Sequence, residues 1–321
     1  MTDSDRESAA EARSEAEGDI VAPPAALDTP APAAAPKKEK KGTDWWGEVK
    51  AIFWLVLAVL GFHSFIAKPF YIPSESMMPT LLVGDRLVVS KYPYGWSWVS
   101  PSFHVFPRTP GRIWGRMPER GDIVIATPPG ESADYIKRVI GLPGDTIEMI
   151  DGQLILNGEP VRRERRAPIM LPIDDNLPCR PDAFGDFRVT GPDGGHYCRL
   201  PIVREYLSNG RHYDTIDLGY SPQGDDYPRT VIPPDHVFLM GDHRDHSADS
   251  RFAAGFPERG LGGPVPWENI GGRAEFITFS LDGSSSYINP ISWFTALRPG
   301  RAGTSLRPAE GPPPPAQGDA Q

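Results

Sequence analysis

The sequence is poor in cysteine and in net positive charge, and it lacks a regular glycine repeat. Two Cys among 321 residues exclude a disulfide-rich scaffold and a Cys₄ zinc site. The formal net charge of -9 argues against nucleic acid as a partner. Because no Gly-X-Y period is present, a collagen-like chain is excluded as well.

Proline and glycine, by contrast, are abundant. The chain has 37 Pro and 33 Gly, more than a fifth of its residues, where about 12% is usual. Because Pro breaks helix interiors, this content excludes a largely helical protein. A hydrophobic content of 39%, with 10% aromatic residues, is enough to bury a core. We therefore expect an all-β protein with mainly antiparallel sheets and many turns.

Both ends of the chain contain little that could build a core. Residues 1–43 and 298–321 hold 11 of the 37 Pro and few large apolar side chains. Such segments cannot bury enough apolar surface to offset the entropy lost on ordering. We expect both to be disordered tails.

One apolar run stands out at residues 51–67, between Lys50 and Lys68. At about 1.5 Å per residue it reaches roughly 26 Å, slightly short of the ~30 Å hydrocarbon core of a bilayer. The two lysines can snorkel, and the apolar residues 70–72 can cover the remainder. We expect a transmembrane anchor over residues 44–70; a cleaved signal peptide and a buried core helix are the alternatives.

The charges around this run predict its orientation. Residues 37–41 read KKEKK and Lys50 follows, whereas the region just after the run is poorer in positive charge. The positive-inside rule then places the tail at residues 1–43 in the cytoplasm. We expect a single-pass protein of the inner (plasma) membrane, with the rest of the chain on the periplasmic side.

Beyond the anchor, the sequence is dominated by short, β-branched runs bounded by turn residues. The expected strands are residues 86–91, 122–127, 135–140, 146–150, 153–156, 230–232, 237–240 and 274–281. We therefore expect an exported β-rich domain at residues 71–297, with insertions at about 92–120 and 162–229. Cys179 and Cys198 lie in the second insertion. An oxidising compartment would permit a disulfide between them; two free buried thiols are the alternative.

Three segments carry polar groups that a plain β domain does not need. The first, PSESMMPTL at residues 73–81, includes Ser74 and Ser76. Serine is a weak nucleophile unless a neighbouring base takes its proton. In isolation, this segment is therefore no more than a Pro-flanked turn.

The second segment, DYIKRVIGLPGD at residues 134–145, contains a lysine within a predicted strand. Because side chains alternate along a strand, Tyr135, Lys137 and Val139 share one face. A lysine that points inward is rare and tends to have a lowered pKa. A solvated lysine on an edge strand is the alternative.

The third segment, GDHRDHSADSR at residues 241–251, concentrates Asp and His side chains in a short loop after a predicted apolar strand. Asp and His are metal ligands, but their spacing fits neither an EF-hand nor an H-E-x-x-H motif. We expect no metal here, and a solvated polar loop is the alternative.

The three segments follow one apolar run in this order. Together they resemble the bacterial type I signal (leader) peptidases, which are membrane-anchored serine proteases with a Ser–Lys dyad. The resemblance covers roughly residues 50–281. Its motifs are a nucleophile box at residues 73–81, a second box at 84–85 and 91–95, a general-base box at 120–124 and 135–145, and a terminal box at 241–251. It implies a signal-peptidase-like β fold and the removal of signal peptides from exported preproteins. The implied partners are preprotein signal peptides and the lipid bilayer, and no cofactor is implied; we expect a monomer.

The resemblance assigns the catalytic dyad to two residues. Ser76 matches the nucleophile and Lys137 matches the general base. An ordinary lysine has a pKa near 10.4 and is protonated at neutral pH. Burial among apolar neighbours disfavours the charge, and a shift to about 8 corresponds to roughly 3 kcal/mol.

The resemblance also assigns four supporting residues. Ser74 matches the residue whose hydroxyl helps the backbone N–H of Ser76 to stabilise the oxyanion. Ser247 matches the serine that supports the lysine. Asp249 and Arg251 match a structural ion pair that holds the site together.

The sequence departs from the family at His243 and His246, where Asn is more common. We expect these histidines on the loop surface or in local hydrogen bonds. The alternative functions are a specialised Ser–Lys peptidase of the pilin or conjugation type, and an inactive membrane-anchored binding module with the same fold.

Overall fold

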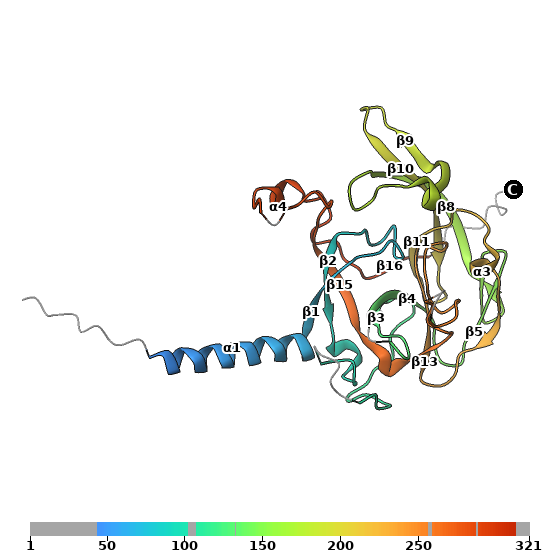
Figure 1. Cartoon of the computed structure of the whole chain (residues 1–321). Helices are drawn as coiled ribbons and strands as arrows, with labels where there is room; N and C mark the ends of the chain where they lie inside the picture. Colours follow the sequence, from blue (N-terminus) through green and yellow to red (C-terminus); the bar gives the residue numbers. More distant parts are fainter. Residues whose placement is uncertain (1–43, 102–106, 132, 256–258, 287, 313–321) are drawn as a thin grey trace, which may run out of the picture. The chain divides into compact units, whose positions relative to one another are not determined.

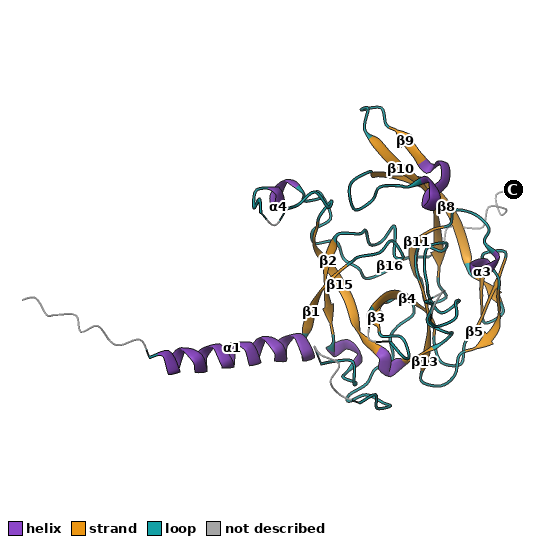
Figure 2. Cartoon of the chain, viewed as in Figure 1, coloured by secondary structure: helices purple, strands orange, loops and turns teal. Residues whose placement is uncertain are grey.

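The computed structural model describes residues 44–101, 107–131, 133–255, 259–286 and 288–312. Strands dominate the described chain, and helices are few and short apart from α1 (Figure 2). The neighbouring strands within each sheet run antiparallel. The predicted all-β class with one N-terminal helix is therefore confirmed. The predicted tail at residues 1–43 lies outside the described residues.

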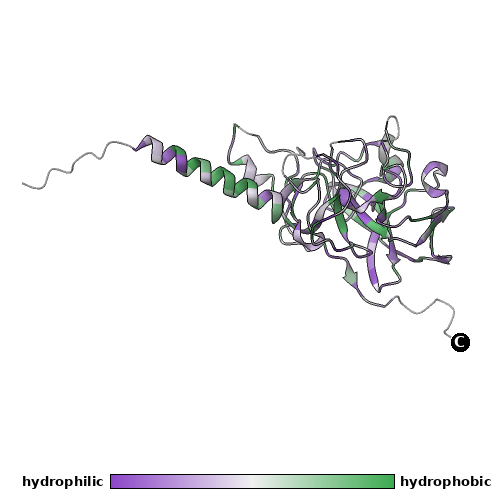
Figure 3. Cartoon of the chain, turned by 90° about the horizontal axis from the view of Figure 1, so that it is seen from below, coloured by the Kyte–Doolittle hydropathy of each residue, from purple (hydrophilic) through white to green (hydrophobic). Residues whose placement is uncertain are grey.

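Helix α1 (Trp45–Phe65) is the one described helix that is long and apolar enough to cross a membrane. Its 21 residues reach roughly 32 Å at about 1.5 Å each, which matches a bilayer core. Figure 3 shows hydrophobic colour along most of this helix. The predicted anchor at residues 44–70 extends too far, because strand β1 (Ala67–Tyr71) begins two residues after the helix ends. Phe70 packs against the core of the sheet instead of extending the span.

The central sheet has seven strands in the order β1-β2-β15-β3-β4-β13-β14 (Figure 1). Its remaining strands are β2 (Asp85–Ser90), β3 (Ile123–Ala126), β4 (Tyr135–Gly141), β13 (His236–Met240), β14 (Val265–Pro266) and β15 (Ile270–Ser280). Strand β3 is buried on both faces, and its residues alternate between two hydrophobic clusters. Ile123 and Ile125 pack into one cluster, whereas Val124 and Ala126 pack into the other. Apolar side chains therefore cover both faces of β3 at the centre of the sheet.

A second, four-stranded sheet follows the order β12-β5-β6-β7. These strands are β5 (Thr146–Ile150), β6 (Gln153–Leu156), β7 (Glu159–Pro160) and β12 (Tyr227–Val231). Between β5 and β6, Asp151 and Gly152 have φ of 47° and 73°. Positive φ at both positions is what a two-residue hairpin turn requires, which is why this dipeptide closes the hairpin tightly.

The segment expected as the second insertion forms most of a third sheet. It contains β8 (Arg162–Pro172), β9 (Arg188–Thr190), β10 (His196–Tyr206) and β11 (Arg211–Ile216), and β16 (Ala309–Glu310) joins at the edge. The short helices α2 (Pro181–Phe184), α3 (Pro222–Asp225) and α4 (Ser292–Thr295) lie in the connections, together with 3₁₀ turns at Tyr92–Tyr94, Gly185–Phe187 and Trp267–Asn269. The insertion at about 92–120 has the first of these turns and no strand among its described residues.

Cys179 and Cys198 form a disulfide in the third sheet, with a Cα–Cα distance of 5.7 Å. Both are buried in a hydrophobic cluster that also contains Phe184, Leu200 and Ile216. Of the two alternatives left by the sequence, the disulfide is the one found. It closes a loop that includes α2 and β9.

Residues 298–312 are described and follow a defined path, so disorder from residue 298 onward is the wrong prediction for this arm. Strand β16 pairs with β11 of the third sheet. Leu306 is 2% exposed and lies in the core cluster of the central sheet. The rest of the predicted tail, residues 313–321, lies outside the described residues.

The arm at residues 298–312 follows a defined path because two of its arginines form ion pairs with carboxylates elsewhere in the chain. Arg298 donates two hydrogen bonds of 2.8 Å to Asp174. Arg301 pairs with the buried carboxylate of Asp85. Composition predicts disorder when a segment has to build its own core, but this arm uses the core of the sheets beside it.

Replacing Cys179 and Cys198 by serine is expected to lower the free energy of unfolding by roughly 3 kcal/mol, because the open loop of about 20 residues gains conformational entropy in the unfolded chain. Denaturant unfolding of the detergent-solubilised full chain measures this. The wild type should lose the same stability on addition of a reductant, whereas the double-serine variant should not respond. Equal unfolding midpoints for the oxidised wild type and the variant would contradict the expectation.

Candidate active site

Ser76 lies in the nucleophile loop, residues 73–81, which connects β1 to β2. Ser76 is 6% exposed, and its Oγ accepts a hydrogen bond of 2.8 Å from Nζ of Lys137. The two residues are 61 positions apart in the sequence. The structure thus brings together the serine and the lysine that the resemblance singles out.

Lys137 points inward because of its place on β4, in the middle of the central sheet. It pairs with Val124 of β3, and Val139 on the same face is completely buried. Burial lowers the pKa of Lys137 to about 8, although the negative charges of Asp249 and Asp242 act in the opposite direction. The amine can therefore be neutral near physiological pH while it touches the hydroxyl of the serine.

Ser74 lies two residues before Ser76, and the two Oγ atoms are 3.4 Å apart. Ser74 is exposed to solvent, whereas Ser76 is buried. A hydroxyl in this place can donate a hydrogen bond to an oxygen atom that develops charge next to Ser76.

The terminal loop, residues 241–251, follows β13, the strand beside β4. Asp249 and Arg251 form a fully buried pair through two contacts of 2.9 Å. Asp249 also accepts a hydrogen bond of 2.9 Å from the backbone N–H of Gly241. Arg251 donates to the carbonyl oxygens of Gly224 and Arg244. The pair that the resemblance implies is present and fixes both ends of the loop.

Gly241 lies where the terminal loop passes close to the nucleophile loop. A Cβ atom on this residue would lie 2.1 Å from Oγ of Ser247 and 2.5 Å from the carbonyl oxygen of Ser76. Only glycine fits, because both distances are shorter than real Cβ contacts allow.

Ser247 lies in this crowded region, but it does not make the contact that was expected of it. Its Oγ is buried and has no hydrogen-bond partner among the described residues. Its support of Lys137 therefore stays a prediction.

One ion pair of the site has no counterpart in the sequence analysis. Arg138, next to the lysine on the opposite face of β4, binds Asp242 through contacts of 2.7 and 2.6 Å, and both are buried. Thr80 of the nucleophile loop donates a hydrogen bond of 2.5 Å to the same carboxylate. The signal for this pair was a charged residue in the middle of a predicted interior strand, but the sequence alone does not show which acid it meets.

Of the two histidines of the terminal loop, His246 is partly exposed, whereas His243 differs from the surface position that was one of the two expectations. His243 is completely buried, and its backbone N–H donates a hydrogen bond of 3.1 Å to the carbonyl oxygen of Ser76. Burial, followed by the neighbouring His246, lowers the pKa of His243 to about 3. The expected local hydrogen bond is present, because Nδ1 of His243 accepts from the backbone N–H of His246 at 3.2 Å. Among the described residues, no group of three or more His, Cys, Asp or Glu is arranged to hold a metal ion.

Comparisons with known proteins agree with one another at the level of the family. The family model described as "Signal peptidase, peptidase S26" matches residues 45–279. The signal peptidase I of Rickettsia typhi is 35% identical over 237 residues, which cover 73% of this chain and 80% of that protein. The signal peptidase I of Rickettsia bellii is 35% identical over 263 residues, 78% of this chain and 80% of the relative.

A search of solved structures finds the crystal structure of a signal peptidase I from Enterococcus faecalis. It is 22% identical and covers 49% of this chain and 97% of the other. The TM-score is 0.24, which is too low for this likeness to carry any inference.

Replacing Asp249 by leucine is expected to lower the free energy of unfolding by about 3 to 5 kcal/mol, because the charge of Arg251 is then buried without its partner. The double change Asp249→Leu with Arg251→Met should cost clearly less, since no buried charge remains. Thermal or denaturant unfolding of the full chain compares the two. An equal loss of stability in the single and the double variant would show that the unpaired charge of Arg251 does not cause it.

Proposed function

Because the chain belongs to the signal peptidase family, peptidase S26, we propose that its catalytic dyad consists of Ser76 as nucleophile and Lys137 as general base. The reaction is the removal of signal peptides from preproteins by a serine endopeptidase. The observation that carries the assignment is the contact of 2.8 Å between a buried amine and a buried hydroxyl.

The geometry supports a complete sequence of proton transfers. Neutral Lys137 takes the proton of Ser76 as Oγ attacks the scissile carbonyl carbon. The resulting oxyanion accepts hydrogen bonds from the backbone N–H of Ser76 and from the hydroxyl of Ser74. The protonated lysine then gives its proton to the leaving amine, and the C–N bond breaks. Water hydrolyses the acyl-enzyme in the same way, with the lysine again acting as the base.

The lowered pKa is what makes a lysine useful here. With a pKa of about 8, roughly a tenth of the lysines are neutral at pH 7, whereas for an ordinary lysine the neutral fraction is below about 0.1%. Neither His243 nor His246 forms a hydrogen bond with Ser76 Oγ in the described residues, so neither is assigned as the base.

The proposal extends to the membrane, with α1 as a single anchor and the β domain on the periplasmic side of the inner membrane. The KKEKK segment at residues 37–41 supports a cytoplasmic N-terminus. The disulfide of Cys179 and Cys198 supports an oxidising compartment for the domain. Strand β1, roughly 16 Å long, separates the end of α1 from the nucleophile loop, so the scissile bond of a membrane-embedded signal peptide is within reach.

Changing Ser76→Ala or Lys137→Met is expected to reduce preprotein processing by at least about a thousandfold, because either change removes half of the dyad. The assay is cleavage of a preprotein by the detergent-solubilised full chain, with the unfolding midpoint as a check that the variants are folded. Processing at the wild-type rate by both variants would show that the dyad is assigned wrongly. An inactive binding module would instead be favoured if the wild type itself did not process the preprotein.

The rate of processing is expected to rise with pH. Only the deprotonated lysine acts as a base, and the neutral fraction of a group with a pKa of about 8 falls tenfold for each pH unit well below that value. kcat/KM should therefore increase about tenfold between pH 6 and 7 and level off above about pH 8. A flat profile between pH 6 and 9 would exclude Lys137 as the base.

A further inference from the structure

The nucleophile loop is held unevenly on the two sides of Ser76. Before the loop, Ile72 exchanges backbone hydrogen bonds of 3.0 Å with the segment at Gly84 and Asp85. Within the loop, the carbonyl oxygen of Ser76 accepts a hydrogen bond from the backbone N–H of His243, which lies in the terminal loop. The intervening residues 73–75 make one described hydrogen bond or ion pair with another part of the chain.

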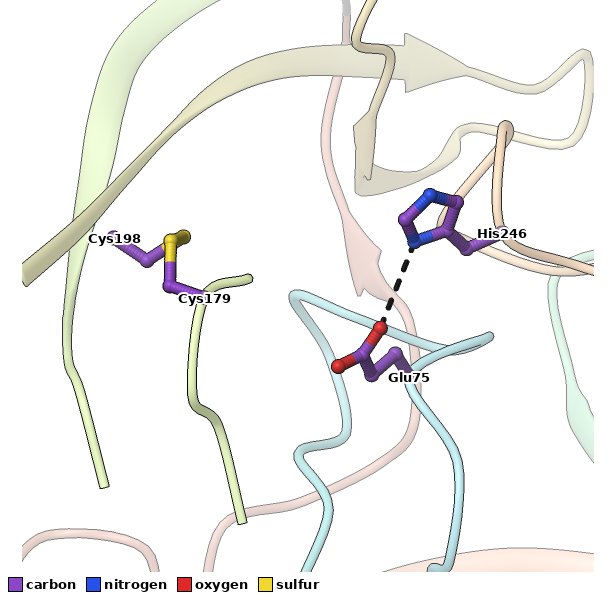
Figure 4. Close-up of a disulfide and its surroundings, with 4 residues drawn as sticks. All are labelled: Glu75, Cys179, Cys198 and His246. Carbon is purple, nitrogen blue, oxygen red and sulfur yellow. Dashed lines mark ion pairs between the residues drawn. A yellow bond between two sulfur atoms is a disulfide. The ribbon is translucent and has the colours of Figure 1, made fainter. Parts of the chain in front are cut away.

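That contact is an ion pair between Glu75 and His246. Oε2 of Glu75 lies 3.6 Å from Nδ1 of His246, and both side chains are about one-quarter exposed. Figure 4 shows the carboxylate and the imidazole facing each other, with the disulfide of Cys179 and Cys198 in the same neighbourhood. Glu75 is the residue between the two serines of the site, so its position affects both.

His246 is itself firmly placed. Its ring stacks on that of His243, with centroids 4.3 Å apart and planes 11° from parallel. The ring of Phe184, from the loop that the disulfide closes, meets it edge-on at 5.3 Å. The backbone N–H of His246 is bound to Nδ1 of His243, which places the ring proton of the buried, neutral His243 on Nε2. The imidazole is thus a firmly placed partner for the carboxylate of Glu75.

We propose that His246 and Glu75 are a positioning pair that holds residues 74–76, and above all the hydroxyl of Ser74, in the geometry needed to stabilise the oxyanion. This inference rests on the proposed function of Ser76. Neither residue of the pair touches the reacting atoms, so the pair acts on kcat through Ser74 and leaves substrate binding unchanged.

The charge on His246 decides how strong the pair is. The titratable groups around the imidazole are Glu75 of the nucleophile loop and His243 and Asp245 of the terminal loop, while α2 presents the ring of Phe184. Asp245 is engaged with the backbone N–H of Leu218 at 2.7 Å. The contact is a pair of opposite charges only when the imidazole of His246 carries its second proton.

The test is kcat and KM for a preprotein, measured on the detergent-solubilised full chain. His246→Asn and Glu75→Gln should each lower kcat about two- to fivefold, the range of a partly exposed ion pair. KM should not change. His246→Lys, which keeps a cation opposite Glu75, should retain kcat. His196→Asn, an exposed histidine on β10, is the matched control and should equal the wild type.

A double-mutant cycle with Ser74→Ala separates positioning from a general structural effect. In the Ser74→Ala background, His246→Asn should have no further effect on kcat, because the group that it positions is gone. An equal loss of kcat in both backgrounds would overturn the proposal. If Ser76→Ala also processes preproteins, the proposed function fails; if Ser76→Ala is inactive and the pair variants equal the wild type, this inference alone fails.

Discussion

As the proposed general base, Lys137 must be buried and uncharged while two carboxylates lie close enough to favour its protonation, and the rest of the site is arranged around this conflict. Asp242 and Asp249 both raise the pKa of the amine. Each is held by its own arginine, Arg138 or Arg251, in a buried pair. A guanidinium beside each acid offsets much of the field that the lysine would otherwise experience. The two ion pairs therefore do more than connect loops, because they allow desolvation to dominate the pKa of Lys137.

The same pairs set the geometry of the site. Asp242 joins β4 to the nucleophile loop through Thr80, and Asp249 fixes the backbone of Gly241 beside Ser247. A buried charged pair contributes little net stability compared with apolar packing. Its contribution here is to geometry. A bidentate contact fixes one relative position of the segments that it joins, whereas apolar side chains would tolerate several.

Linear motifs made part of the site predictable, because Ser74, Ser76 and Lys137 occur in short segments and the strand period points the lysine inward. Strand β1 was hidden because its apolar residues continue the hydrophobic run of α1. The arm at residues 298–312 was misjudged because its arginines are stabilised by acids more than 100 positions away. The pairing of Glu75 with His246 was equally invisible, since no local pattern reveals which residues meet across such separations.

These separations have a consequence for when the site forms. Ser76 is 61 residues from Lys137, its proposed base. Thr80 is 162 residues from Asp242, and the carbonyl oxygen of Thr80 accepts a hydrogen bond from Arg301, 221 residues away. The entropy of closing such long loops must be overcome before these contacts stabilise anything. The nucleophile loop follows soon after helix α1 in the sequence and is made early, yet it acquires its final geometry only when nearly the whole chain has folded around it.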